Sequence, residues 1–167
     1  MKVIITPLMI VVFVFCVVSC SPTTPLPANQ NSSDIGDAQQ VLTSFLKNLR
    51  NGNYDKAAKQ YGGTYEVMIE QNPSADRSDP AGLLKNACTI NGYECLKVKS
   101  VVLEENSSAN EFTFKVELVN NDGTLFIQGP CCGGNETDSP SQASFLFKVI
   151  SDIEGKFWVM DMPPYTP

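Results

Sequence analysis

The sequence contains no histidine among its 167 residues. Histidine is the usual base in serine and cysteine nucleophile pairs and a frequent metal ligand, so its absence excludes both arrangements. Acid–base chemistry near neutral pH would then need a carboxyl, lysine or tyrosine group with a shifted pKa. The acidic residues are scattered without the spacing of a cation-binding loop, and the cysteines lack paired Cys-x-x-Cys knuckles. We therefore predict no catalytic residue, no metal site and no cofactor.

Positive charge is also scarce. The chain has 12 Lys and Arg against 18 Asp and Glu, for a formal net charge of −6. An acidic balance of this kind argues against nucleic acid as a partner and against electrostatic docking on anionic lipid. Hydrophobic residues make up 43% of the chain, which is enough for a packed core of about one domain.

A long apolar run occurs at the N-terminus, from Val3 to Val18, directly after Met1 and Lys2. Its length of about sixteen residues is short for a membrane span, which needs about 20, but suits the core of an export signal. The run ends in Val17-Val18-Ser19-Cys20, which resembles the lipobox of bacterial lipoproteins. The alternatives to a lipoprotein signal at this N-terminus are an ordinary cleaved signal or an uncleaved short anchor.

The lipobox resemblance implies three things. Residues 1–19 are a signal peptide that is removed, Cys20 carries the lipid that anchors the chain to a membrane, and the rest lies outside the cytoplasm in the cell envelope. Stable anchoring takes two acyl chains or more, because a single chain binds only marginally. Residues 20–36 are rich in proline, serine and amides, so we predict a flexible tether there and a folded domain over 37–167.

The folded part changes period along the chain. Asp37 and Gln40 form a plausible capping pair for a first helix that Gly52 ends. Apolar residues at helical spacing predict three further helical segments, over 54–61, around 65–69 and from Asp79-Pro80 to Cys88. Alternating residues then predict five strands, over 96–103, 112–118, 124–128, 145–149 and 156–161, with a hairpin turn at 120–123. The order predicts an α+β fold in which N-terminal helices pack on a curved antiparallel meander sheet.

Two segments resemble nuclear transport factor 2-like domains. FLKNLRNGNYDKAAKQY (Phe45 to Tyr61) is similar to their opening helix, turn and second helix, and SFLFKVISDIEGKFWVMDMPPY (Ser144 to Tyr165) to their last hairpin. The resemblance implies a cone-shaped sheet with an internal pocket. Some members are isomerases, dehydratases or cyclases, and many others only bind ligands or partners. The enzymes usually place an aspartate–histidine or similar acid–base pair in the pocket, and this chain has no histidine for that half of the pair.

Four cysteines remain beyond Cys20, namely Cys88, Cys95, Cys131 and Cys132, and an oxidising compartment favours disulfides among them. In the predicted meander, Cys95 precedes the first strand and Cys131 follows the third, so roughly 30 Å would separate them. A disulfide needs Cα atoms about 4.4–6.8 Å apart, so we expect Cys88–Cys95. Three states stay open for Cys131 and Cys132: a vicinal disulfide, reduced or intermolecularly bridged thiols, or cross-pairing.

Aromatic side chains are the pocket candidates, and their alternative role is to pack helices on the sheet. They are Tyr61, Tyr65, Tyr93 and Trp158, with Tyr54 beside them. The leading hypothesis is a non-catalytic domain that binds an unknown small molecule or envelope protein and meets the membrane through lipid on Cys20. The alternatives are a small lyase or isomerase using aspartate and tyrosine, and a structural envelope component, such as a homodimer packed through the open sheet face.

Overall fold

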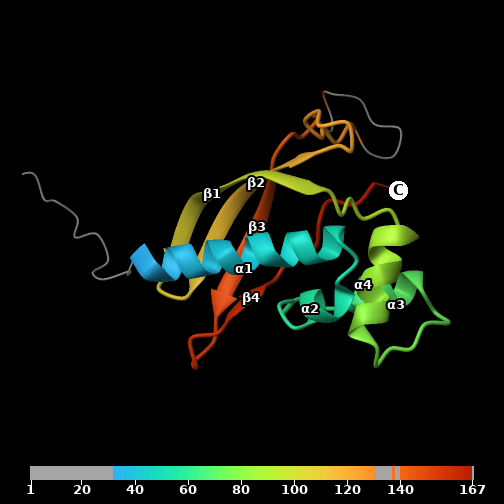
Figure 1. Cartoon of the computed structure of the whole chain (residues 1–167), viewed down its shortest axis with the longest axis horizontal. Helices are drawn as coiled ribbons and strands as arrows, with labels where there is room; N and C mark the ends of the chain where they lie inside the picture. Colours follow the sequence, from blue (N-terminus) through green and yellow to red (C-terminus); the bar gives the residue numbers. More distant parts are fainter. Residues whose placement is uncertain (1–31, 131–136, 138–139, 167) are drawn as a thin grey trace, which may run out of the picture.

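The computed structural model describes residues 32–130, 137 and 140–166. A long helix, α1 (Ser32–Arg50), crosses one face of an antiparallel sheet, and three short helices lie beside its C-terminal end (Figure 1). These are α2 (Tyr54–Ala58), α3 (Glu66–Gln71) and α4 (Pro80–Thr89). The predicted α+β class is confirmed. None of the described helices is long and apolar enough to cross a membrane.

Helix α1 begins at Ser32, more than one turn before the predicted start. Asp37 lies inside the helix, so the predicted capping pair is wrong, and the predicted tether boundary at residue 36 is too late. The apolar stripe explains the early start: Ile35 packs against the core one turn before Ala38 and continues the face that Leu42 and Phe45 bury.

The other helices follow the prediction except at one end. Helix α4 starts as expected, with the Asp79 side chain accepting from the Gly82 amide at 2.9 Å and proline in its first turn. Helix α2 ends at Ala58, before the predicted Tyr61. Tyr61 instead forms a parallel bridge to Val159, and the Gly62 amide donates to the Val159 carbonyl at 2.9 Å, so the chain here runs along the sheet.

The described sheet has the order β1-β2-β3-β4. Its strands are β1 (Lys97–Ser108), β2 (Glu111–Val119), β3 (Phe145–Ser151) and β4 (Phe157–Val159). Strand β1 lies at one edge of the sheet, and three register irregularities interrupt its pairing with β2. The predicted strand over 124–128 is wrong, because β2 pairs directly with β3 and that segment forms only isolated bridges. The turn before it is confirmed, with the Gly123 amide donating to Asn120 O at 3.0 Å.

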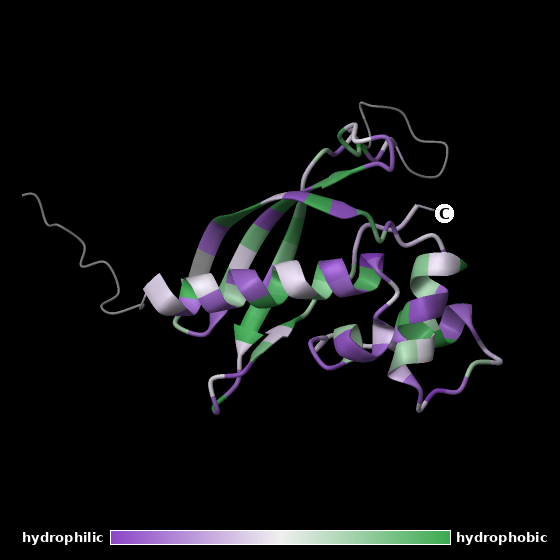
Figure 2. Cartoon of the chain, viewed as in Figure 1, coloured by the Kyte–Doolittle hydropathy of each residue, from purple (hydrophilic) through white to green (hydrophobic). Residues whose placement is uncertain are grey.

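The core lies between α1 and one sheet face, where alternate residues of β2 and β3 are buried. Figure 2 shows hydrophobic residues on the strands and on the helix face turned toward them. The fully buried aromatic rings are Phe45, Phe112, Phe114 and Phe147, and no described buried side chain is polar or charged. The opposite sheet face carries ion pairs, including Lys115–Glu104 at 2.7 Å and Lys99–Glu117 at 3.3 Å.

Candidate binding site

Cys88 and Cys95 form the predicted disulfide, with Cα atoms 5.5 Å apart. The predicted meander that would separate Cys95 from Cys131 by the length of the sheet is wrong, because residues 124–128 form no strand of it. Without a strand over 124–128, β2 is followed by a loop that starts beside Lys97, the partner of Val119, and therefore at the Cys95 end of the sheet. Cys20, Cys131 and Cys132 lie outside the described residues, so the lipid site and the vicinal pair stay predictions.

The loop that the disulfide closes, residues 88–95, is hydrogen-bonded to the C-terminal segment, residues 164–166. The Glu94 amide donates to Pro164 O and the Thr166 amide to Gly92 O, both at 2.9 Å. The rings of Tyr93 and Tyr165 pack with centroids 5.4 Å apart. Gly92 has φ +83, and an added Cβ would meet Thr166 O, so both its backbone conformation and its close approach require glycine.

The structure brings two of the four aromatic pocket candidates, Tyr61 and Tyr65, into contact, whereas Tyr93 packs on Tyr165. Tyr61 and Tyr65 meet edge to face at 5.1 Å, and Tyr61 also stacks on Phe45 at 5.8 Å. Burial raises the pKa of Tyr61 above its ordinary value, and the nearby Tyr65 and Tyr93 add to the effect. Tyr61 is only 7% exposed and its hydroxyl donates to Thr64 O at 3.0 Å. These rings pack on one another and on the core, and a ligand pocket among them stays a prediction.

Trp158 is not part of that cluster. It alternates with the buried Val159 on β4 and so points to the opposite sheet face. Its indole Nε1 donates to Asp152 Oδ2 at 2.9 Å, and Lys156 Nζ lies 3.4 Å from the ring centroid. The tryptophan therefore closes the β3–β4 turn, with a cation over its face.

A groove of about 330 Å³ lies between the C-terminal half of α1 and the start of β1. We call it the α1–β1 groove. The half-buried Leu96 and Val98 supply its apolar surface and pack against the core. The described residues that line it are Thr43, Lys47, Arg50, Asn51, Leu96, Lys97 and Val98.

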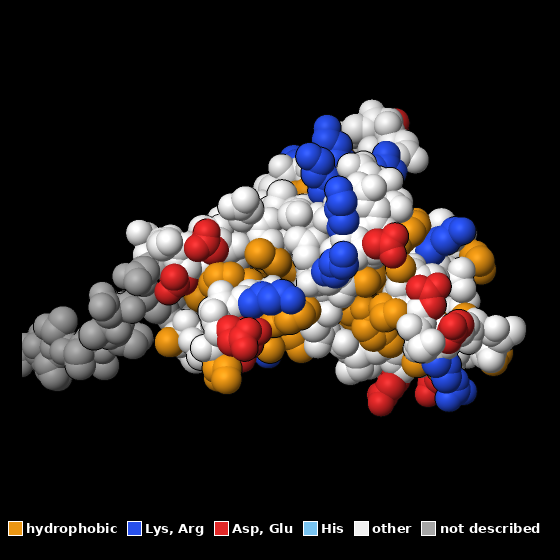
Figure 3. Space-filling model, turned by 60° about the horizontal axis from the view of Figure 1, so that its bottom comes forward, with side chains coloured by type: hydrophobic (Ala, Val, Ile, Leu, Met, Phe, Trp, Pro, Cys, Tyr) orange, Lys and Arg blue, Asp and Glu red, His pale blue; other side chains and the backbone are white. Residues whose placement is uncertain are grey.

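Three cations line this groove, and its described lining includes no carboxylate. Lys47 and Arg50 lie three residues apart at the end of α1, and Lys97 opens β1. None of the three forms an ion pair within the part of the chain that the structure describes. Arg50 Nη2 donates to Asn121 Oδ1 at 2.7 Å, a neutral partner, so its charge stays uncompensated there. On the face shown in Figure 3, Lys and Arg side chains form a row across the molecule.

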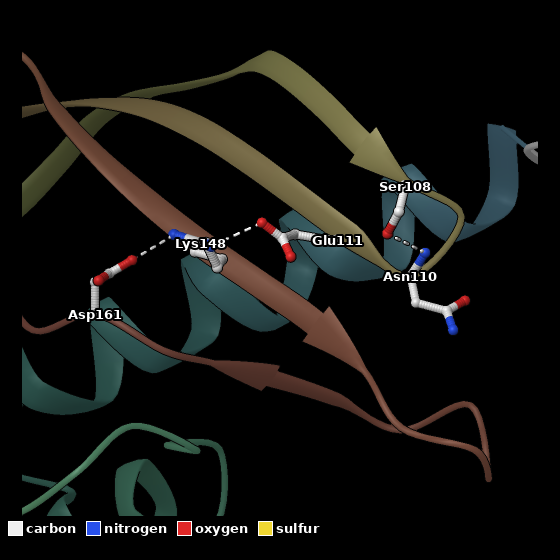
Figure 4. Close-up of polar contacts among 5 residues, drawn as sticks. All are labelled: Ser108, Asn110, Glu111, Lys148 and Asp161. Carbon is white, nitrogen blue, oxygen red and sulfur yellow. Dashed lines mark hydrogen bonds and ion pairs between the residues drawn. The ribbon is translucent and has the colours of Figure 1, made fainter.

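A second groove, of about 600 Å³, lies on the open sheet face and differs in its charges. Its lining includes both members of the Glu104–Lys115 ion pair. Asp161, at its edge, accepts from the Lys148 amide at 2.6 Å, while Lys148 Nζ pairs with Glu111 at 2.7 Å (Figure 4). The side chain of Glu111 raises the pKa of Lys148 by hydrogen bonding and by its charge. The lining of this groove carries charges of both signs, so an anion meets less electrostatic attraction here than in the α1–β1 groove.

Sequence reasoning did not predict the α1–β1 groove. One signal was available: Lys47 and Arg50 share one side of a helix end, where cations interact favourably with the helix dipole. Nothing in the sequence brings Lys97 beside them, because that contact depends on how α1 crosses the sheet. No protein-family model matches the chain, and no curated protein matches it either.

Proposed function

We propose that this chain is a lipid-anchored protein of the bacterial cell envelope whose folded domain binds a small ligand in the α1–β1 groove without catalysing a reaction. The observation that carries the binding role is a groove with apolar side chains and three cations that form no ion pair among the described residues. A charge that merely keeps a surface soluble needs no such concave, partly apolar setting.

The anchor rests on the sequence Val17-Val18-Ser19-Cys20 at the end of the apolar run. Helix α1 begins at Ser32, so residues 21–31 remain as the tether between lipid and domain. Fully extended, such a segment reaches about 35 Å. That length keeps the domain close to the membrane surface while leaving it room to turn.

The family to which this α+β fold belongs is also a proposal. We propose a nuclear transport factor 2-like domain, which is supported by a long helix along one sheet face, short helices beside the end of that helix, and a closing β3–β4 hairpin. Such folds serve both enzymes and binding proteins, so the fold alone does not assign a function.

A binding role fits the interior better than catalysis. An acid–base enzyme of this kind would need a carboxyl group held beside a tyrosine in a desolvated pocket. The described core holds no charged side chain, and the hydroxyl of the buried Tyr61 already donates a hydrogen bond to a backbone carbonyl. Its raised pKa makes it a poor general acid or base near neutral pH.

Mass spectrometry tests the two parts of this proposal separately. For the anchor, intact-mass analysis of the membrane fraction should find a mature chain that starts at a lipid-modified Cys20. A chain starting elsewhere would refute it. For binding, native mass spectrometry of protein from its own host should find a small co-purified molecule. That molecule should be lost in Lys47→Gln/Lys97→Gln and retained in Lys56→Gln/Lys85→Gln, which removes two exposed lysines elsewhere. Equal retention by both variants would refute the groove as the site.

A further inference from the structure

We infer that the ligand of the α1–β1 groove is a small amphiphile with one anionic head group and an apolar body, of the fatty-acid type. This inference rests on the proposed function, because it names the class of ligand for the same site.

The charge of the groove selects an anion. Lys47, Arg50 and Lys97 converge from two elements, and the described lining brings no carboxylate to balance them. Part of this charge offsets the partial negative charge at the C-terminal end of α1. Lys97 belongs to β1 and is not needed for that purpose, so its charge adds to the positive charge of the described lining. This local excess is notable in a chain whose formal net charge is −6.

The apolar surface selects the body of the ligand. Leu96 and Val98 are half-buried, so a ligand lying on them would remove further apolar area from water. An inorganic anion would use the cations and leave this surface exposed. An uncharged apolar molecule would cover the surface and leave the cations unused. Only a molecule with both an anionic head group and an apolar body would contact the cations and the apolar side chains of the groove together.

The size of the groove limits the ligand to a small molecule. Its volume of about 330 Å³ lies at the lower end of ordinary ligand pockets, which span about 300–1,000 Å³. The guanidinium of Arg50 has five donor hydrogens and gives one nitrogen to Asn121, so donors remain for a carboxylate. The head group would therefore lie toward Arg50 and the two lysines, and the chain along β1.

The test uses the full lipidated protein in nanodiscs of zwitterionic phospholipid, with empty nanodiscs as the reference. Octanoate, octanol and octylammonium share one apolar chain and differ in head-group charge. Hydrogen exchange read by mass spectrometry reports which segments each one protects, and titration of that protection gives the affinity. We expect octanoate to bind saturably and to protect peptides covering 43–51 and 96–98.

Two double variants of equal net charge test which lysines contribute to octanoate binding. Lys47→Gln/Lys97→Gln should weaken octanoate binding about tenfold, as expected for two partly exposed ionic contacts. Lys56→Gln/Lys85→Gln has the same net charge and should bind like the wild type. Equal weakening in both variants would mean that only overall charge matters and would overturn the inference.

The other outcomes separate the ligand class from the site. If octanol or octylammonium protects the groove as strongly as octanoate, the groove is a binding site but the anionic class is wrong. If none of the three protects it, both the ligand class and the binding role of the groove are refuted. A parallel sample in nanodiscs of anionic phospholipid distinguishes the source of the head group. Protection there without protection by octanoate would mean that a membrane surface, and not a single amphiphile, occupies the groove.

Discussion

Removing the Cys88–Cys95 disulfide should both lower the free energy of unfolding and loosen the C-terminal segment. The perturbation is the double variant Cys88→Ser/Cys95→Ser, which avoids leaving one thiol to exchange with others. With a sequence separation of 7 between the cysteines, the chain-entropy relation gives a loss of about 2.4 kcal/mol at 25 °C. Urea denaturation followed by circular dichroism measures this difference.

The structure adds a local effect to the global one. The bonded loop presents Gly92 and Glu94 to the C-terminal segment through two backbone hydrogen bonds of 2.9 Å. In the variant, the Glu94 and Thr166 amides should exchange with solvent faster than the global loss of stability alone allows, whereas amides of β2 should follow the global loss. The variant Cys131→Ser/Cys132→Ser keeps the 88–95 bond and is the matched control.

Two results would contradict this reasoning. A loss of stability below about 0.5 kcal/mol would mean that the bond hardly restricts the unfolded chain. A uniform rise in exchange across β2 and the C-terminal segment would mean that the bond acts through the unfolded state alone and does not position the loop.

Three further predictions concern single side chains. Burial raises the pKa of Tyr61 above 10.0, so this side chain ionises at a lower pH in the unfolded chain than in the folded one. The stability that its neutral form contributes is therefore complete below about pH 10 and is lost as the pH rises further. The stability gap between wild type and Tyr61→Phe in urea should therefore narrow by about 1 kcal/mol per pH unit above pH 10; a constant gap would contradict the burial of this hydroxyl. Asp79→Ala removes the cap bond to the Gly82 amide and should cost about 1 kcal/mol in thermal unfolding, whereas Asp79→Asn should cost much less. Phe114→Ala should cost about 3–5 kcal/mol in urea because the ring is fully buried, and Leu146→Ala, at a side chain 60% exposed, should cost under about 0.5 kcal/mol; a larger cost for Leu146→Ala than for Phe114→Ala would mean that the core lies on the other sheet face.

The sequence predicted best where a local pattern and a buried face coincide. The alternation Phe112, Phe114, Val116 and Leu118 identifies β2 because every second residue must be apolar when one face is buried. The start of α4 was equally readable, since Asp79 and Pro80 are a cap and a first-turn residue whose roles are local.

It failed where a tertiary contact overrides the local signal. Residues 124–128 have a strand-like pattern after a good turn, but β3 occupies the pairing edge of β2. Tyr61 continues a helical pattern and yet pairs with Val159, because an extended chain can hydrogen-bond beside β4. The α1–β1 groove was missed for a similar reason. Leu96 and Val98 appear in the sequence as ordinary strand residues, and only the packing of α1 makes them the wall of a groove.

The irregular edge strand β1 bears on how this protein behaves at high density. An open strand edge exposes backbone donors and acceptors that can pair with another molecule, and a straight, apolar edge promotes aggregation. Strand β1 departs from regular register at three points, and charged side chains such as Lys97, Lys99 and Glu104 follow one another along it. Lipid anchoring would confine many copies to two dimensions, with their edges held at similar heights. The irregular, charged edge would then prevent neighbouring copies from pairing their β1 strands into a shared sheet.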